Sequence, residues 1–334
     1  MSDARSSSAT ATTGTAEPGR PYRGRFAPSP SGPLHFGSLV AAVGSFLEAR
    51  VRGGQWLVRI EDLDPPRERP GAADDILRTL DHLGLHWDGP VLRQSARSAA
   101  YEAALERLGT AGRLRSCLCS RGQLTALPAN QQRGPGEELF HPPQCLAVNS
   151  GMTGRPPALR FRAPDCEVEF VDRVQGRQRA NVARSVGDFV LKRSDGLFAY
   201  QLAVVVDDAE QGVTDIVRGA DLLSSTPRQI VLQDALGLRP LTYMHLPIAV
   251  SETGLKLSKS EDAPALSRSS SAAQIVAALE FLRQAPPAGL ERAPLAEVWQ
   301  WANVHWQPER IAGIRTGRVT LEQGAHEQTG SSSP

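Results

Sequence analysis

Two segments of this 334-residue chain carry residues suited to phosphate chemistry. In the first, His35, Gly37 and Ser38 follow a predicted strand and open a predicted helix. Free backbone N–H groups and the helix dipole favour a phosphate at such a helix start, and Gly37 lets a nucleotide approach the backbone closely. Taken alone, a turn rich in Pro and Gly with one histidine is also common in ordinary loops.

The second segment is Lys256-Leu-Ser-Lys259-Ser, in a loop after the last apolar strand. Ligands of open α/β sheets gather at the carboxyl ends of the strands, where this loop is expected to lie. A solvated basic loop is the alternative interpretation of this segment when it is considered alone.

A third group of residues is suited to a metal. Cys117 and Cys119 are followed by His141 and Cys145, and three thiols with one imidazole make a closed tetrahedral zinc set. Because four protein ligands leave no open position, such a zinc would be structural. The alternative is that the cysteines are small buried residues and the histidine lies on the surface. Cys166 is interpreted as an ordinary thiol.

Alternating elements must position the first of these groups. Strands predicted over residues 23–26 and 55–60 alternate with helices over 38–51 and 71–83, each with one apolar stripe. This order is typical of an α/β fold with a parallel sheet.

The second half of the chain continues the pattern. Apolar segments at 189–192, 199–206 and 244–250 are interpreted as strands, and residues 225–236 as a helix with Pro227 in its first turn. The result is a doubly wound sheet, and two helical segments follow it, near residues 272–282 and 295–304.

The two phosphate-type segments together resemble the HIGH and KMSKS signatures of class I aminoacyl-tRNA synthetases. The resemblance implies that His35, Lys256 and Lys259 stabilise charge as a carboxylate attacks the α-phosphate of ATP, which is bound with Mg²⁺. It also implies ATP binding by Gly37 and Ser38, although Ser38 stands where the signature has its second histidine. The lack of a Walker A sequence agrees with this family.

Further segments resemble glutamyl-specific members of that family, with coverage from about Tyr22 to Leu266. They begin at Arg25, Arg59, Tyr200 and Asp215. A dicarboxylic amino acid needs fixed cations and an anion in one pocket, and the resemblance assigns these roles to Arg25, Arg218 and Glu61, with neutral hydrogen bonds from Ser29 and Tyr200. Surface ion pairs, each worth about 0 to 1 kcal/mol, are the alternative.

Arg218 favours glutamate over glutamine, because a neutral amide would leave a buried guanidinium without its anion. Glutamyl synthetases and their short paralogues also often bind zinc in the insertion, which supports the zinc assignment. The fold expected is therefore a Rossmann-like doubly wound parallel sheet with a zinc-bearing insertion and a short helical segment at the end.

The sequence divides into six predicted regions. They are a disordered tail (1–21), the first half of the catalytic domain (22–112), the zinc-bearing insertion (113–180), the second half with the lysine loop (181–266), a short helical segment (267–322) and a second disordered tail (323–334). The last two regions are too short for the helical anticodon-binding domains of a full glutamyl-tRNA synthetase.

That shortness makes the resemblance closest to the short paralogues, which attach glutamate to queuosine at the wobble position of tRNA-Asp. We therefore expect a glutamyl-adenylate and its transfer to queuosine. A compact glutamyl-tRNA synthetase that charges a 3′ end and a catalytically silent tRNA-binding homologue are the alternatives. A net charge of +1 indicates only a local RNA-binding face. Without a secretory signal or an apolar span, a cytoplasmic protein is expected. A monomer is expected as well.

Overall fold

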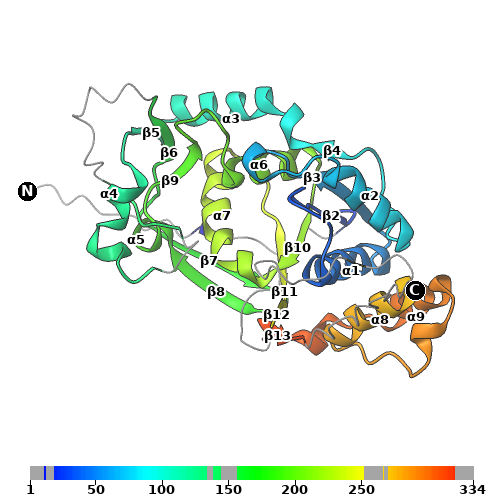
Figure 1. Ribbon diagram of the computed structural model, residues 1–334. Coiled ribbons are helices and arrows are strands. Elements are labelled where there is room, and N and C mark those ends of the chain that lie inside the picture. The colour runs from blue at the N-terminus through cyan, green and yellow to red at the C-terminus, as the bar shows by residue number, and fades with distance from the viewer. Residues whose placement is uncertain are drawn as a thin grey trace, which may run out of the picture.

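The computed structural model describes residues 11–12, 19–133, 138–143, 156–251, 266 and 270–319. Within these ranges the chain forms a mixed α/β fold, with an antiparallel sheet at one end and a pair of helices at the other (Figure 1). None of the helices in these ranges is long and apolar enough to cross a membrane.

The first half of the central sheet is parallel, as predicted. It contains β2 (Arg23–Phe26), β3 (Gln55–Ile60) and β4 (Leu92–Arg93), paired in that order. Helix α1 (Phe36–Val51) connects β2 to β3, and α2 (Ala72–His82) follows β3. The apolar stripes of both helices lie in one core with the strands, which is the burial that their helical spacing predicts.

The second half of the sheet is also parallel. It contains β10 (Asp215–Gly219), β11 (Thr242–Leu246) and β7 (Glu167–Asp172). Strand β10 lies beside β2, because the Arg23 N–H donates to Thr214 Oγ1 at 2.8 Å and the Thr214 N–H donates to the Arg23 carbonyl at 2.9 Å. The two halves thus lie beside each other, and their parallel pairings confirm the predicted fold class.

One predicted strand is wrong. Residues 199–206 lie in a helix, α6 (Tyr200–Glu210), and not in a strand. Leu202, Ala203 and Val204 are buried side by side, and a continuous apolar run of this kind does not distinguish a buried strand from a buried helix. Helix α6 packs with α7 (Thr226–Ala235) and α3 (Ser98–Thr110) around a second core beside the sheet.

The insertion has its own three-stranded antiparallel sheet, shown at the end of the molecule away from α8 and α9 in Figure 1. Its strands are β5 (Leu114–Cys117), β6 (Ala158–Phe161) and β9 (Phe189–Lys192), and two short helices accompany it, α4 (Arg121–Thr125) and α5 (Val182–Ser185). Strand β9, expected in the second half of the catalytic domain, therefore pairs with the insertion.

The helices after the lysine loop pack against the catalytic core. Helices α8 (Ser271–Phe281) and α9 (Leu295–His305) confirm the two predicted segments and share a core with α1 (Figure 1). Trp306 Nε1 donates to the buried Glu48 carboxylate of α1 at 2.8 Å. An unpredicted strand, β13 (Thr316–Arg318), pairs with β12 (Ile248–Val250).

Smaller elements complete the described ranges. Strand β8 (Gly176–Asn181) forms a hairpin with β7, and β1 (Ala11–Thr12) pairs with the other edge of β7. Strand β1 lies in the tail that the sequence predicts to be disordered. Its two residues pair with β7, whose open edge offers backbone N–H and C=O groups. Short 3₁₀ helices span Pro65–Arg67, Gln94–Ala96, Pro128–Asn130, Ala220–Ser225, Leu290–Arg292 and Pro308–Ile311.

Candidate active site

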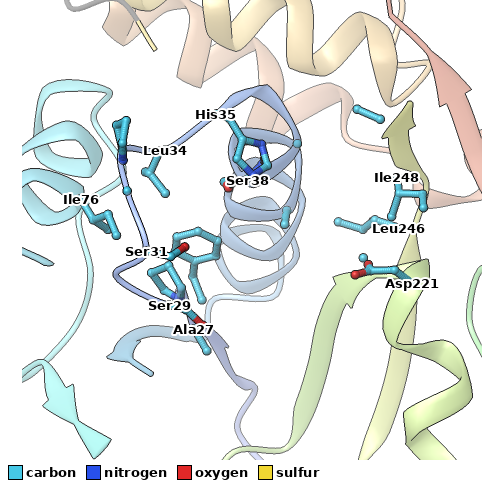
Figure 2. Close-up of a pocket in the computed structure, with 18 of the residues that line it drawn as sticks. Ala27, Ser29, Ser31, Leu34, His35, Ser38, Ile76, Asp221, Leu246 and Ile248 are labelled. Carbon is cyan, nitrogen blue, oxygen red and sulfur yellow. Dashed lines mark hydrogen bonds between the residues drawn. The ribbon is translucent and has the colours of Figure 1, made fainter. Parts of the chain in front are cut away.

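A pocket of about 300 Å³ lies at the carboxyl ends of β2, β10 and β11. Figure 2 shows Ser29 and His35 on the side formed by the first loop and α1, and Asp221 and Ile248 across from them. The carboxyl edge of a parallel sheet is where open α/β folds bind ligands. The pocket therefore brings together segments that are about two hundred residues apart in the sequence.

His35 is the N-cap of α1. The Ser38 N–H donates to His35 Nδ1 at 3.3 Å, and Ser38 Oγ lies 3.1 Å from His35 Nε2. The first turn of α1 lines the pocket and holds no acidic residue. The positive end of the helix dipole is therefore not offset by a carboxylate within that turn. A Cβ on Gly37 would lie 3.1 Å from the His35 ring, and glycine thus keeps this turn compact.

The lysines of the second signature, Lys256 and Lys259, lie outside the described residues. The residues that flank their loop are described, and both flanks lie at the pocket. Ala249 lines the pocket before the loop, and after it the Leu266 N–H donates to the carbonyl of Leu34, another lining residue, at 3.1 Å.

Beside the pocket, Arg218 is 5% exposed and bonded only to neutral groups among the described residues. Its Nη2 donates to Thr226 Oγ1 at 2.9 Å and to Gln229 Oε1 at 2.8 Å, and its Nε donates to His245 Nε2 at 3.1 Å. Its Nη1 donates to the Tyr200 hydroxyl at 3.4 Å. A buried guanidinium whose partners are neutral favours an anionic ligand.

A second charged group lies next to Arg218. Arg25 and Arg59 both donate to the Asp208 carboxylate, at 3.0 and 2.7 Å, and Arg59 donates to Glu61 at 3.4 Å. Burial raises the pKa of Glu61, and the two guanidinium groups oppose this. For Asp208, burial acts in the same direction but Arg25 and Arg59 outweigh it, so its pKa is lowered.

Tyr200 connects these groups. Its hydroxyl accepts from Arg218, and burial raises its pKa, so the phenol stays neutral. The charges of Arg218, Glu61 and Arg25 all act on it. The structure thus brings Arg25, Glu61, Tyr200 and Arg218 together, and the fifth predicted residue, Ser29, lines the adjoining pocket.

Sequence reasoning assigned no role to three residues that support this group. Asp208 is buried in α6 and bonds both Arg25 and Arg59, while Asp172 and His245 form a pair behind Arg218. The signal available for each was a polar residue within an apolar run, a pattern that does not by itself distinguish support of a site from support of the core.

Three of the four predicted metal ligands meet in the insertion. The ligand atoms of Cys117, Cys119 and His141 lie within 4.8 Å of one another, and Cys117 Sγ is 3.1 Å from His141 Nε2. Tetrahedral zinc with its usual bond lengths would separate such atoms by about 3.5 to 3.8 Å. Burial lowers the pKa of His141 to about 4, which leaves the neutral imidazole that binds metals. The three residues fit a metal ion, and Cys145 lies outside the described residues.

Two further residues hold the histidine in place. Gly187 has a φ of +72°, and a Cβ there would lie 1.8 Å from the His141 carbonyl oxygen, so only glycine allows this approach. Asn130 donates to the Leu124 and Phe140 carbonyls and accepts from the Phe140 N–H. The segment before His141 is thus bonded to the segment after the Cys117 and Cys119 pair.

Comparisons with known proteins agree with this geometry. Residues 22–293 match the family model "tRNA synthetases class I (E and Q), catalytic domain". A protein from Dechloromonas aromatica named glutamyl-Q tRNA(Asp) synthetase is 57% identical over 86% of this chain and 94% of its own length. One of the same name from Chromobacterium violaceum is 53% identical over 87% of this chain and 95% of its own length.

A solved structure shows the same fold. A glutamate tRNA ligase from Elizabethkingia meningosepticum, crystallised with its amino acid, aligns with a TM-score of 0.71 at 21% identity. The alignment covers 90% of this chain and 67% of that one.

Proposed function

Since the chain belongs to the class I tRNA synthetases for glutamate and glutamine, and within them to the glutamyl-Q tRNA(Asp) synthetases, we propose that it activates L-glutamate with ATP and transfers the glutamyl group to queuosine of tRNA-Asp. Glutamate is proposed as the amino acid because Arg218 is buried and its partners among the described residues are all neutral. A side-chain carboxylate of the substrate supplies the missing anion.

In the activation step, an oxygen of the glutamate α-carboxylate attacks the α-phosphorus of ATP. The bond from this phosphorus to the oxygen that bridges to the β-phosphate breaks, and pyrophosphate leaves with Mg²⁺. We assign stabilisation of the triphosphate to His35 and the N-terminus of α1, with Gly37 and Ser38, and to Lys256 and Lys259. We assign to Glu61 the hydrogen bond from the substrate's ammonium group, and to Arg25, Ser29 and Tyr200 the other hydrogen bonds.

In the transfer step, a hydroxyl of the queuosine ring attacks the carbonyl carbon of the adenylate. An ester forms, AMP leaves, and the hydroxyl proton is released. Unpaired bases of an anticodon loop can enter a protein pocket, where stacking and edge hydrogen bonds read them. The chain covers 94% and 95% of the two relatives named for this acceptor, which supports extending their acceptor to this chain.

The acceptor is tested with labelled glutamate and tRNA-Asp from cells that do or do not make queuosine. We expect label only on the queuosine-containing tRNA, released with the wobble nucleoside after nuclease digestion. Label on the 3′ adenosine, or equal label on both tRNAs, would contradict the queuosine acceptor and favour a compact glutamyl-tRNA synthetase. Adenylate formation without any transfer would favour neither acceptor.

We also propose that the metal held by Cys117, Cys119 and His141 is zinc, with Cys145 as fourth ligand. Three thiolates with one imidazole are one of the ligand sets of structural zinc. Four protein ligands leave the metal no open coordination position for a substrate or water. Its role is therefore to order the insertion. The monomeric state and the cytoplasmic location stay predictions from the sequence.

Elemental analysis should find one zinc per chain, and Cys119→Ser should lower that content. Because the metal orders the insertion and not the pocket, removing it with a chelator should reduce glutamyl transfer more than pyrophosphate exchange. Cys166→Ser is the matched control, since Cys166 lies outside the ligand group, and it should keep its zinc. Protein without zinc and with full transfer activity would contradict the assignment.

A further inference from the structure

Behind Arg218 lies a buried pair that the reaction described above does not use. His245 Nδ1 is 2.6 Å from Asp172 Oδ2, and both side chains are fully buried. His245 Nε2 accepts from Arg218 Nε at 3.1 Å. The three residues come from β7, β11 and β10, which lie side by side in the parallel sheet.

The protonation of His245 follows from the groups that face its ring. Asp172 faces Nδ1, and Arg218 Nε faces Nε2, which also lies 3.3 Å from Thr226 Oγ1. A guanidinium N–H is only a donor, so His245 Nε2 must be the acceptor and carries no proton. The ring proton is then on Nδ1, where it donates to Asp172. Asp172 is fixed in turn, because its Oδ1 accepts the backbone N–H groups of Val174, Gln175 and His245.

This arrangement gives Arg218 an oriented neutral acceptor in place of a carboxylate. Had Asp172 reached Arg218 directly, the ion pair would have competed with an incoming carboxylate. With the imidazole between them, Nε and Nη2 are held by the protein, while Nη1 has one bond, to Tyr200. The guanidinium is thus fixed in orientation and still lacks an anionic partner within the described part of the chain.

We propose that His245 is a positioning residue for glutamate selection. Held as the Nδ1–H tautomer by Asp172, it orients the Arg218 guanidinium toward the side-chain carboxylate of the substrate. The inference rests on the proposed role of Arg218, and it predicts an effect on glutamate affinity that ATP affinity does not share.

Two variants distinguish the roles of the two ring nitrogens of His245. His245→Asn places an amide nitrogen near the position of Nδ1 and leaves Arg218 Nε without its acceptor. His245→Gln places an amide oxygen near the position of Nε2 and can restore that acceptor. We expect the KM for glutamate in pyrophosphate exchange to rise about tenfold or more in His245→Asn and by less than about threefold in His245→Gln. In both, kcat and the KM for ATP should stay near wild type.

Tyr243→Phe is the matched control, because it removes a buried hydrogen bond on the same strand, to Gln233 at 3.2 Å, without touching Arg218. It should lower stability without changing the KM for glutamate. In the wild-type protein, ¹⁵N NMR of the imidazole, assigned by its loss in His245→Gln, should show the Nδ1–H tautomer.

Three results would overturn the proposal: a wild-type KM in His245→Asn, equal KM values in the Asn and Gln variants, or an Nε2–H tautomer. A parallel rise in the KM for ATP would point to general loss of structure and would also count against it. If wild-type protein shows no glutamate-dependent exchange, the proposed function itself fails, which is a distinguishable result.

Discussion

Replacing Arg218 with leucine should reduce kcat/KM for glutamate in pyrophosphate exchange by about 10²- to 10³-fold, because the substrate carboxylate would enter a buried site without its cation. The loss for glutamine should be much smaller, since a neutral amide gains little from the guanidinium. Pyrophosphate exchange measured with glutamate, glutamine and aspartate tests both statements. The wild-type protein should use glutamate far better than the other two.

Arg97→Leu provides the control for this variant. Among the described residues, Arg97 is a partly buried arginine that, unlike Arg218, has an anionic partner, Asp207 at 3.2 Å, and it does not line the pocket. It should lower stability without changing the preference for glutamate. Equal exchange with glutamine and glutamate in the wild-type protein would remove Arg218 as the residue that discriminates between them.

Replacing Asp208 with asparagine should lower the free energy of unfolding by about 3 to 5 kcal/mol at neutral pH, the cost typical of breaking a buried ion pair from one side. Arg25 and Arg59 are 3% and 0% exposed, and both donate to this carboxylate. Urea denaturation of the two proteins measures the difference. Glutamate-dependent exchange should fall as well, because Arg25 loses the partner that orients it.

The effect of this substitution should depend on pH. The pKa of Asp208 is lowered in the folded protein, so its stabilising contribution is present above the unfolded value of about 3.9 and is lost as the pH falls through the folded value. The difference between the two proteins should therefore be largest near neutral pH and shrink below about pH 4. A constant difference across this range would contradict an electrostatic origin.

The neighbouring Asp207 gives a matched comparison. Asp207 is also fully buried, but its partners are two neutral groups, Gln94 and Tyr101, and one partly exposed guanidinium, that of Arg97. Asp207→Asn should therefore cost less than Asp208→Asn. Equal losses would show that burial alone, and not the two guanidinium partners of Asp208, accounts for the effect.

The local pattern of the sequence was enough for most of the fold. Amphipathic spacing predicted α1, α2, α8 and α9 to within two residues at each end, and β2 and β3 with their observed bounds. It failed at α6, where apolar residues run without a period because most of the helix is buried against α3 and α7. It also gave no sign of β13, which pairs with β12, far away in the sequence.

The candidate site also has one part that the sequence predicted and one part that it did not. The resemblance to class I synthetases and to their glutamyl-specific members selected His35, Arg25, Glu61, Tyr200 and Arg218, because each lies in a segment that matches one of their motifs. The support behind them was not predictable, since Asp172 and His245 are about seventy residues apart and meet only when β7 pairs with β11. Which cations are neutralised by the protein and which still need an anion depends on these distant pairings. The sequence therefore determined the chemical groups of the site. The tertiary structure decided that Asp208 is the partner of Arg25 and that Arg218 has neutral partners among the described residues, which is why we propose Arg218 for the carboxylate of the substrate.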